Sequence, residues 1–192
     1  MTRPIPPRAI AIGCSAGGLR ALETLLAGLD PGLTQTLLVC CHTGSSDVDL
    51  LCELLRGHSR LPVIEAAERA PLRDGIVQVA PSGYHLLVEA DRHFALSVDA
   101  RVSFARPAID VLFNTAADAY RQQLIAVVLT GANHDGADGL SNVRRRGGVA
   151  IVQLPADAEV ATMPQAALDK AGADYCVPLD AIAPLLNRLC LS

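Results

Sequence analysis

The chain has 192 residues, which suits one compact domain or at most two, and 51% of them are hydrophobic, enough for a sizeable core of mainly aliphatic side chains because aromatics make up only 3%. The formal net charge of −4 argues against a nucleic-acid-binding protein, which is usually basic with a clustered positive face. The N-terminus lacks a signal-peptide pattern and no stretch approaches the roughly 20 apolar residues of a membrane span, so the sequence favours a cytoplasmic protein. None of the six cysteines forms a Cys-x-x-Cys pair, which favours reduced thiols and no metal site.

Continuous apolar runs alternate with segments of helical periodicity along most of the chain. The apolar runs predict parallel strands covered on both faces. They span residues 9–12, 37–41, 124–129 and 149–154. The helical segments include residues 19–29, 51–55, 109–116, 140–143, 164–171 and 181–191. We expect Ser45 or Ser46 to cap the second helix, Gly57 to end it and Gly172 to close the fifth. The basic cluster Arg144 to Arg146 falls at the end of the fourth, where cations complement the helix dipole.

The middle of the chain has a different pattern. Three short runs with partial alternation span residues 77–80, 85–89 and 94–98, and residues 90–93 are typical of a hairpin turn. We therefore predict an α/β fold in a single domain over residues 1–192. It has a doubly wound, mostly parallel sheet with an antiparallel hairpin inserted near its middle, and helices on both faces complete a three-layer sandwich.

The sequence Gly13-Cys14-Ser15-Ala16-Gly17 fits the G-x-S-x-G pattern between the first predicted strand and the first predicted helix. An elbow of this kind lifts a serine oxygen to the top of a sheet, and glycines on both sides let the backbone turn tightly. Amides at the start of the helix can then stabilise an oxyanion. Ser15 is therefore a candidate nucleophile.

Polar side chains also follow two other predicted strands. His42 comes directly after residues 37–41, and Asp135 lies in the loop after residues 124–129. Ligands of open α/β sheets bind beyond the carboxyl ends of the strands. Ser15, His42 and Asp135 are therefore expected at one edge of the sheet, where they would form a catalytic triad in a chain order that differs from that of α/β-hydrolases.

Each of these residues also has a structural interpretation. Ser15 and Asp135 can cap the helices that follow them, and His42 can be a partly buried loop histidine. Cys14 is a rival nucleophile, although strand alternation predicts that it points away from the face of Ser15. His134 is a candidate second base or metal ligand. A dinucleotide site at the same glycines is disfavoured, because the second strand ends in a histidine rather than in an acidic residue.

Five segments, in order along the chain, resemble motifs of the catalytic domain of CheB methylesterases. Residues 12–18 (IGCSAGG) resemble the I-G-A-S-T-G-G opening of that domain, and residues 129–139 (LTGANHDGADG) resemble its L-T-G-M-G-x-D-G-A-x-G. Residues 79–85, 106–113 and 163–167 resemble A-P-G-x-x-H, P-S-V-D-x-L-F and M-P-x-A-A. The resemblance covers nearly the whole chain.

The resemblance implies a serine hydrolase that demethylates glutamate methyl esters on the cytoplasmic signalling helices of chemoreceptors, releases methanol and also deamidates receptor glutamines. Carried over by motif, the nucleophile is Ser15, the base His42 and the orienting acid Asp135. The family's oxyanion hole uses backbone amides near the positions that are Ala16 and Ala132 here. The resemblance implies no cofactor and no metal.

The sequence departs from the family pattern beside the predicted site. Ala16 replaces the usual threonine, Ala132 the usual methionine, and Asn133 and His134 replace small residues next to the acid. Two alternatives therefore stay open: a catalytically weakened domain that only docks on receptor helices or a signalling partner, and an esterase of small molecules. Well-known members of the family also carry an N-terminal receiver domain, whereas this sequence starts only a few residues before its first predicted strand. We therefore expect a free-standing esterase whose activity is independent of phosphodonors.

Overall fold

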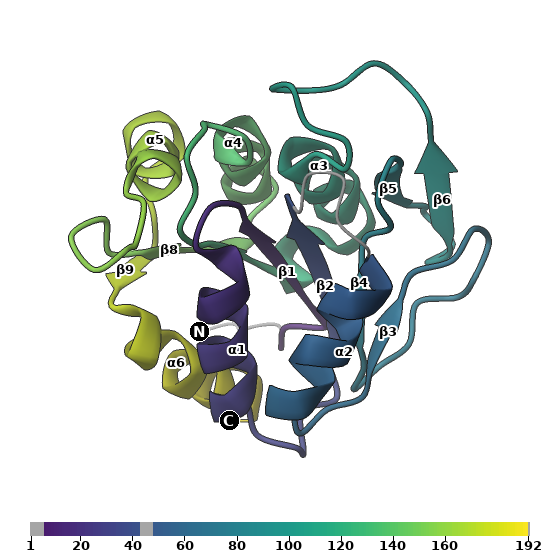
Figure 1. The fold of residues 1–192 in the computed structure, drawn as a ribbon, viewed down its shortest axis with the longest axis horizontal. Helices are drawn as coiled ribbons and strands as arrows, with labels where there is room; N and C mark the ends of the chain where they lie inside the picture. Colours follow the sequence, from purple (N-terminus) through teal and green to yellow (C-terminus); the bar gives the residue numbers. More distant parts are fainter. Residues whose placement is uncertain (1–5, 43–47, 192) are drawn as a thin grey trace.

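The computed structural model of the chain describes residues 6–42 and 48–191. Within them, one parallel sheet has the strand order β3-β4-β2-β1-β7-β8-β9, and a separate antiparallel sheet consists of β5 and β6 (Figure 1). The strands are β1 Ala9–Cys14, β2 Thr36–Cys41, β3 Val63–Glu65, β4 Val77–Val79, β5 His85–Val88, β6 Phe94–Ser97, β7 Leu124–Val128, β8 Val149–Gln153 and β9 Tyr175–Val177. The predicted doubly wound α/β class is confirmed, with β1 between β2 and β7 at the centre of the sheet.

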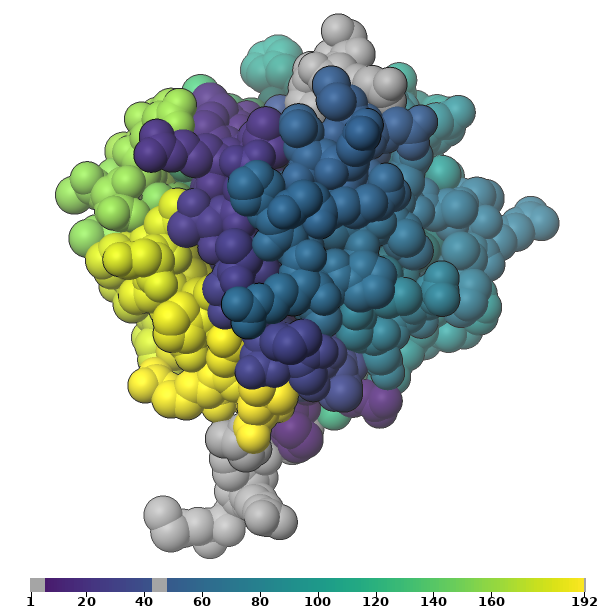
Figure 2. Space-filling view, turned by 60° about the horizontal axis from the view of Figure 1, so that its bottom comes forward, coloured from purple at the N-terminus to yellow at the C-terminus, as the bar shows by residue number. Residues whose placement is uncertain are grey.

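Helices cover both faces of this sheet and complete the predicted three-layer sandwich. The helices are α1 Gly18–Gly28, α2 Val48–His58, α3 Ile109–Tyr120, α4 Ala137–Arg145, α5 Thr162–Ala171 and α6 Leu179–Leu191. Figure 1 shows α1, α2 and α6 on one side of the sheet and α3, α4 and α5 on the other. In Figure 2, α6 in yellow, α1 in purple and α2 in blue lie side by side across one face of the molecule.

The continuous apolar runs follow from burial on both faces of the sheet. Ile10 and Ile12 of β1 pack into the core beneath α1, α2 and α6, whereas Ala11 packs into the core beneath α3, α4 and α5. At Gly13 the start of α3 comes onto the strand, and a Cβ there would overlap the side chain of Ile109. The absence of a side chain at Gly13 therefore lets α3 begin close to the carboxyl end of β1.

The antiparallel hairpin lies outside the main sheet, which corrects its predicted insertion near the middle of that sheet. β5 and β6 pair with each other, and the place beside β2 is taken by β4, which is parallel to it. The hairpin is instead attached to α3 and the residue before it. Thr115 Oγ1 accepts the N–H of Val88 (3.1 Å), and His85 Nδ1 accepts the N–H of Ala108 (3.2 Å).

The remaining differences from the sequence prediction lie at short strands and helix ends. β3 and β9 were not predicted, because runs of three residues are too short to show a period. α2 continues through Gly57 to His58, and the predicted caps Ser45 and Ser46 lie outside the described residues. α5 ends at Gly172 as predicted. No helix in the described part of the chain is long and apolar enough to cross a membrane.

The close packing of α3 on α4 gives a testable prediction. A Cβ on Gly139 of α4 would lie 2.6 Å from the Cβ of Phe113 and 3.1 Å from the Cα of Asp110, both on α3. Because backbone atoms cannot move aside locally, we expect Gly139→Ala to lower the free energy of unfolding in urea by about 1–3 kcal/mol. The matched control is Gly57→Ala in α2, where nothing lies within 4 Å and where alanine is expected to stabilise the helix by up to about 1 kcal/mol. Equal stability of the two variants would contradict this account.

Candidate active site

Ser15 stands on a tight turn between β1 and α1. Gly17 has φ +76°, a left-handed conformation that glycine adopts without strain, and α1 begins at the next residue. The Ser15 N–H donates to the carbonyl of Thr130 in the loop after β7 (3.0 Å), and the Ser15 carbonyl accepts the N–H of Gly18 (2.7 Å). No side-chain hydrogen bond caps α1, so helix capping does not account for the Ser15 hydroxyl.

His42 lies beside this elbow because β2 runs parallel to β1. Cys14 and Cys41 are in register, and the N–H of His42 donates to the Cys14 carbonyl (3.1 Å). Ser15 and His42 line one cleft, but within the described residues no hydrogen bond joins the Ser15 hydroxyl to the imidazole. Catalytic hydrogen bonds are often long or unformed in a free enzyme and tighten when substrate binds.

The carboxylate of Asp135 is completely buried and accepts three hydrogen bonds. Its Oδ2 accepts from His42 Nε2 (2.8 Å) and from the N–H of Ile109 (2.7 Å), and its Oδ1 accepts the N–H of Asp110 (2.9 Å). Burial acts to raise the pKa of Asp135, but the hydrogen bonds from the imidazole and the two amides outweigh burial and hold the pKa below its usual value. Asp135 is therefore an anion that caps α3, not α4, the helix that follows it in sequence.

Helix α3 makes a reciprocal contact with α4. Asp110, in the first turn of α3, accepts the N–H of Gly139 in the first turn of α4 on its Oδ1 (2.7 Å). Burial raises the pKa of Asp110 to about 6; the Gly139 hydrogen bond opposes this shift, and the negative charge of Asp135 adds to it. Asp110 was not predicted as a site residue, since only its burial beside a second carboxylate distinguishes it from an ordinary acidic residue in a first helical turn.

A cleft of about 480 Å³ opens over Ser15 and His42. Leu19 of α1 and Leu50 and Leu54 of α2 line it, and these side chains are 37%, 53% and 41% exposed. Leucines of this exposure are apolar surface left in contact with water, and here three of them line the same cleft as Ser15. The cleft can therefore take a ligand that is apolar beside its reacting group.

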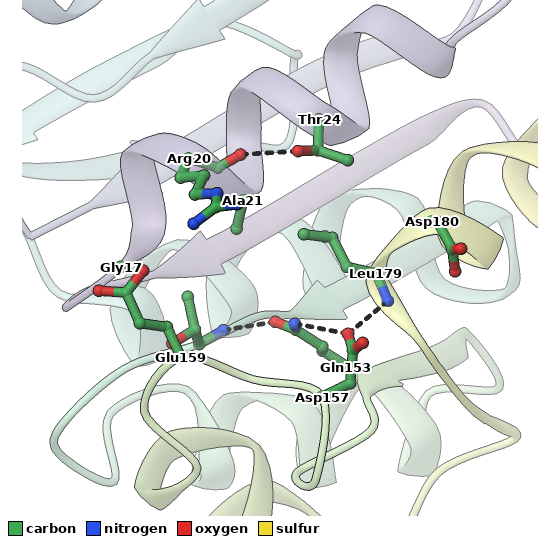
Figure 3. A pocket seen from close by; sticks show the side chains of 10 residues that line it. Gly17, Arg20, Ala21, Thr24, Gln153, Asp157, Glu159, Leu179 and Asp180 are labelled. Atoms are coloured by element: carbon green, nitrogen blue, oxygen red, sulfur yellow. Dashed lines mark hydrogen bonds between the residues drawn. The ribbon is translucent and has the colours of Figure 1, made fainter.

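A second cleft, of about 440 Å³, shares Gly17, Arg20 and Glu159 with the first and extends to the start of α6 (Figure 3). A chain of hydrogen bonds runs beneath it. The Thr130 N–H donates to Gln153 Oε1 (2.9 Å), Gln153 Nε2 donates to Asp157 Oδ2 (3.1 Å), and the same oxygen accepts the N–H at the start of α6 (2.8 Å). These hydrogen bonds connect the loop after β7 to α6, in the helical layer formed by α1, α2 and α6.

Thr130 also holds the elbow itself. Its hydroxyl donates to the carbonyl of Ala16 (2.9 Å) and accepts the N–H of Val160 (2.8 Å). Thr130 is polar and buried. Its position directly after the apolar run of residues 124–129 is the sequence signal that could have identified it. Its contacts fix the turn that carries Ser15 against the loop that carries Asp135.

The two predicted oxyanion positions are available as donors. Within the part of the chain that the structure describes, the N–H groups of Ala16 and Ala132 have no hydrogen-bond acceptor. Both residues are exposed, and they follow the carboxyl ends of the adjacent strands β1 and β7. Unpaired amides that adjoin a nucleophile can stabilise the negative oxygen of a tetrahedral intermediate.

The other candidates of the sequence analysis have weaker positions. Cys14 is fully buried, and a hydrogen bond with Cys41, together with burial, raises its pKa well above the usual value, which disfavours a nucleophilic thiolate. His134 is exposed. Among the described residues no group of three or more His, Cys, Asp or Glu side chains could hold a metal ion. Arg144 and Arg146 form ion pairs within the domain.

A parallel α/β sheet that brings a serine elbow, an imidazole and a buried carboxylate to adjacent strand ends has the arrangement of a serine hydrolase. Comparison with known proteins specifies the class further. The family model described as CheB methylesterase matches residues 10–186. The chain therefore belongs to the CheB methylesterase family, and the predicted resemblance is confirmed.

Individual relatives agree with this membership. A Leptospira interrogans protein (strain Fiocruz L1-130) that carries the name protein-glutamate methylesterase/protein-glutamine glutaminase is 42% identical over 181 residues, 94% of each chain. The enzyme of that name from Symbiobacterium thermophilum is 35% identical over 96% of this chain, which spans 51% of that relative. The crystal structure of the Thermotoga maritima CheB methylesterase catalytic domain superposes with a TM-score of 0.92 at 30% identity, covering 96% of this chain and 100% of that one.

The raised pKa of Asp110 gives a prediction about stability and pH. Because its pKa is about 6 in the folded protein and near 3.8 otherwise, the unfolded chain ionises first, and raising the pH from 5 to 7 favours unfolding at this position. Asp110→Asn removes that ionisation. We expect the stability of the variant relative to wild type to rise by about 1 kcal/mol between pH 5 and pH 7, measured by urea unfolding at both values.

The control for this experiment is Asp118→Asn on the same helix. Asp118 is largely exposed and pairs with Arg146 (2.6 Å), so its removal is expected to change stability by less than about 1 kcal/mol. A relative stability of Asp110→Asn that is flat or falling from pH 5 to pH 7 would be inconsistent with a buried carboxyl that resists ionisation.

Proposed function

We propose that the protein is a protein-glutamate methylesterase that hydrolyses glutamate methyl esters on the cytoplasmic helices of chemoreceptors and also deamidates glutamines there. The observation that carries the proposal is the 2.8 Å hydrogen bond between the buried Asp135 carboxylate and His42, beside the elbow that presents Ser15. Membership of the CheB methylesterase family and the names of the relatives support the substrate.

The proposed reaction proceeds through an acyl-enzyme. The Ser15 oxygen attacks the ester carbonyl while His42 takes the hydroxyl proton, and the same proton then leaves with methanol as the C–O bond breaks. Water enters, loses a proton to His42 and releases the glutamate side chain and free Ser15. A glutamine substrate follows the same steps, with ammonia as the leaving group. Asp135 stays ionised throughout and stabilises the imidazolium, in keeping with its lowered pKa.

The negative oxygen of each tetrahedral intermediate is assigned to the backbone amides of Ala16 and Ala132. Their N–H groups lack acceptors within the described residues, as donors reserved for a reacting group would. Since both are backbone groups, the substitution of the usual threonine and methionine by alanine keeps the donors and changes only the shape of the surrounding pocket.

The cleft also suits a helical substrate. A receptor helix that presents a side chain to Ser15 must lay its neighbouring turns over the cleft walls, where Leu19, Leu50 and Leu54 are exposed. Amphipathic helices bind apolar grooves through residues at i, i+3, i+4 and i+7 spacing. We therefore assign the leucines of α1 and α2 to contacts with apolar residues that flank the modified glutamate.

The first experiment measures methanol release from receptor-containing membranes whose glutamates carry a labelled methyl group. Ser15→Ala should reduce release by at least about 10⁴-fold, because removal of the nucleophile leaves only the residual effect of binding and the oxyanion donors. Ser141→Ala in α4 is the control and should keep wild-type activity. Wild-type release that persists undiminished in Ser15→Ala would refute the assigned nucleophile, and release by none of the folded proteins would refute the substrate.

A second experiment tests the leucine surface. Leu54→Glu places a charge where an apolar flank of the substrate is expected, so KM for methylated receptor should rise about tenfold while turnover of a small ester stays unchanged. Val98→Glu changes a 68% exposed side chain outside the cleft-lining set and serves as the control, with no effect on either substrate. Equal losses on both substrates in Leu54→Glu would indicate damage to the catalytic residues instead of lost docking.

A further inference from the structure

Asn133 occupies the side of His42 that Asp135 leaves free. Its Nδ2 lies 3.4 Å from His42 Nδ1, while Asp135 Oδ2 lies 2.8 Å from His42 Nε2. Both ring nitrogens of the assigned base therefore have a partner, one an amide and the other a carboxylate. The proposed reaction gives this amide no part. The amide nevertheless lies against Nδ1, the ring nitrogen that Asp135 leaves free to accept the proton of Ser15.

The orientation of the Asn133 amide follows from its second hydrogen bond. Its Oδ1 accepts the N–H of Asp135 (3.1 Å), a group that can only donate. The NH₂ group must therefore point to His42 Nδ1. Since an NH₂ group also only donates, Nδ1 must carry a lone pair, and the ring proton must lie on Nε2, where the buried carboxylate accepts it. A single tautomer of the neutral ring satisfies both contacts.

We propose that Asn133 is a positioning residue that holds the neutral His42 ring with its lone pair on Nδ1 and opposes protonation of that nitrogen until Ser15 delivers its proton. The inference rests on the proposed function, in which His42 is the base. At 3.4 Å the contact is long for an N–H donor, so it orients the ring without competing strongly with the serine hydroxyl.

Besides this amide, charged groups also lie near His42. Within the described residues, Arg20, Glu23 and Glu159 line the same cleft, Asp135 binds the ring, and Asp110 adjoins Asp135. The carboxylates favour a charged imidazolium and the guanidinium disfavours it. All of them stay in place when Asn133 is substituted, so a change in the protonation of His42 is attributable to residue 133.

The test is Asn133→Asp. An aspartate keeps an acceptor for the Asp135 N–H but puts a carboxylate oxygen against Nδ1, which reverses the interaction with a protonated ring. We expect the protonation midpoint of His42, followed by NMR of its ring, to move up by about one pH unit or more. The acid limb of kcat/KM for a small ester should move with it, so that the rate at pH 6 relative to its plateau falls about tenfold.

Two further variants complete the comparison. Asn133→Ala removes the donor without adding charge, and the midpoint should rise by about half a pH unit, as expected for one weak hydrogen bond. His134→Ala alters the same exposed loop without touching the ring and should leave the midpoint unchanged.

The outcomes separate the two proposals. An unmoved or lowered midpoint in Asn133→Asp, or a loss of rate by the same factor at every pH in both Asn133 variants, would overturn the inference and leave Asn133 with a merely structural role. The NMR midpoint does not depend on the substrate. Shifted midpoints without methanol release from receptors by the wild type would therefore support the role of Asn133 while refuting the proposed function.

Discussion

The solvation of one buried carboxylate determines the geometry of this site. Asp135 is excluded from water, and an anion in that position is stable only where hydrogen bonds replace its hydration. Its donors are the imidazole that follows β2 and the first two amides of α3, which are distant from Asp135 in sequence. Because all three must reach the same two oxygens, the end of β2, the start of α3 and the loop after β7 have one mutual arrangement, and His42 is positioned as a consequence.

The packing of α3 on α4 adds further contacts to this arrangement. Each helix has its first turn capped by a carboxylate from the other segment, since Asp135 binds the start of α3 and Asp110 binds the start of α4. Two glycines permit the close approach that these caps need, Gly13 beneath the start of α3 and Gly139 against its first turns. Asp110 makes an unfavourable contribution to the free energy of folding, because it is a buried carboxyl near a second negative charge. Its raised pKa reflects this contribution. The close packing of α3 and α4 beside His42 is thus obtained at the expense of stability at neutral pH.

Local sequence patterns were sufficient to predict the central strands and the turn that carries Ser15. The central strands were predicted because burial on both faces leaves continuous apolar runs, and the elbow because glycines mark the turn. The edge strands β3 and β9 were missed for lack of length, and the hairpin was misplaced because nothing in its alternation says which element it packs against. The partners of Asp135 on α3, 25 and 26 residues away, leave no trace in spacing. The amide of Asn133 was noted only as a departure from a motif, because its contact with His42 exists only in the fold.

The strand order bears on which nitrogen of His42 would act as the base in the proposed reaction. In the usual triad the acid binds Nδ1 and the serine meets Nε2; here the acid binds Nε2. The sheet order is β2-β1-β7, so His42 and Asp135 follow the strands on either side of the one that carries Ser15. His42 contacts the buried carboxylate through Nε2, the ring nitrogen farther from the backbone. Nδ1, next to the ring carbon that carries Cβ, is the remaining nitrogen, and the backbone N–H of His42 donates to the carbonyl of Cys14 at the end of β1, which Ser15 follows directly. The proposed reaction therefore combines two features of this fold, a serine that follows the middle strand and a histidine whose Nε2 is already bonded to the acid.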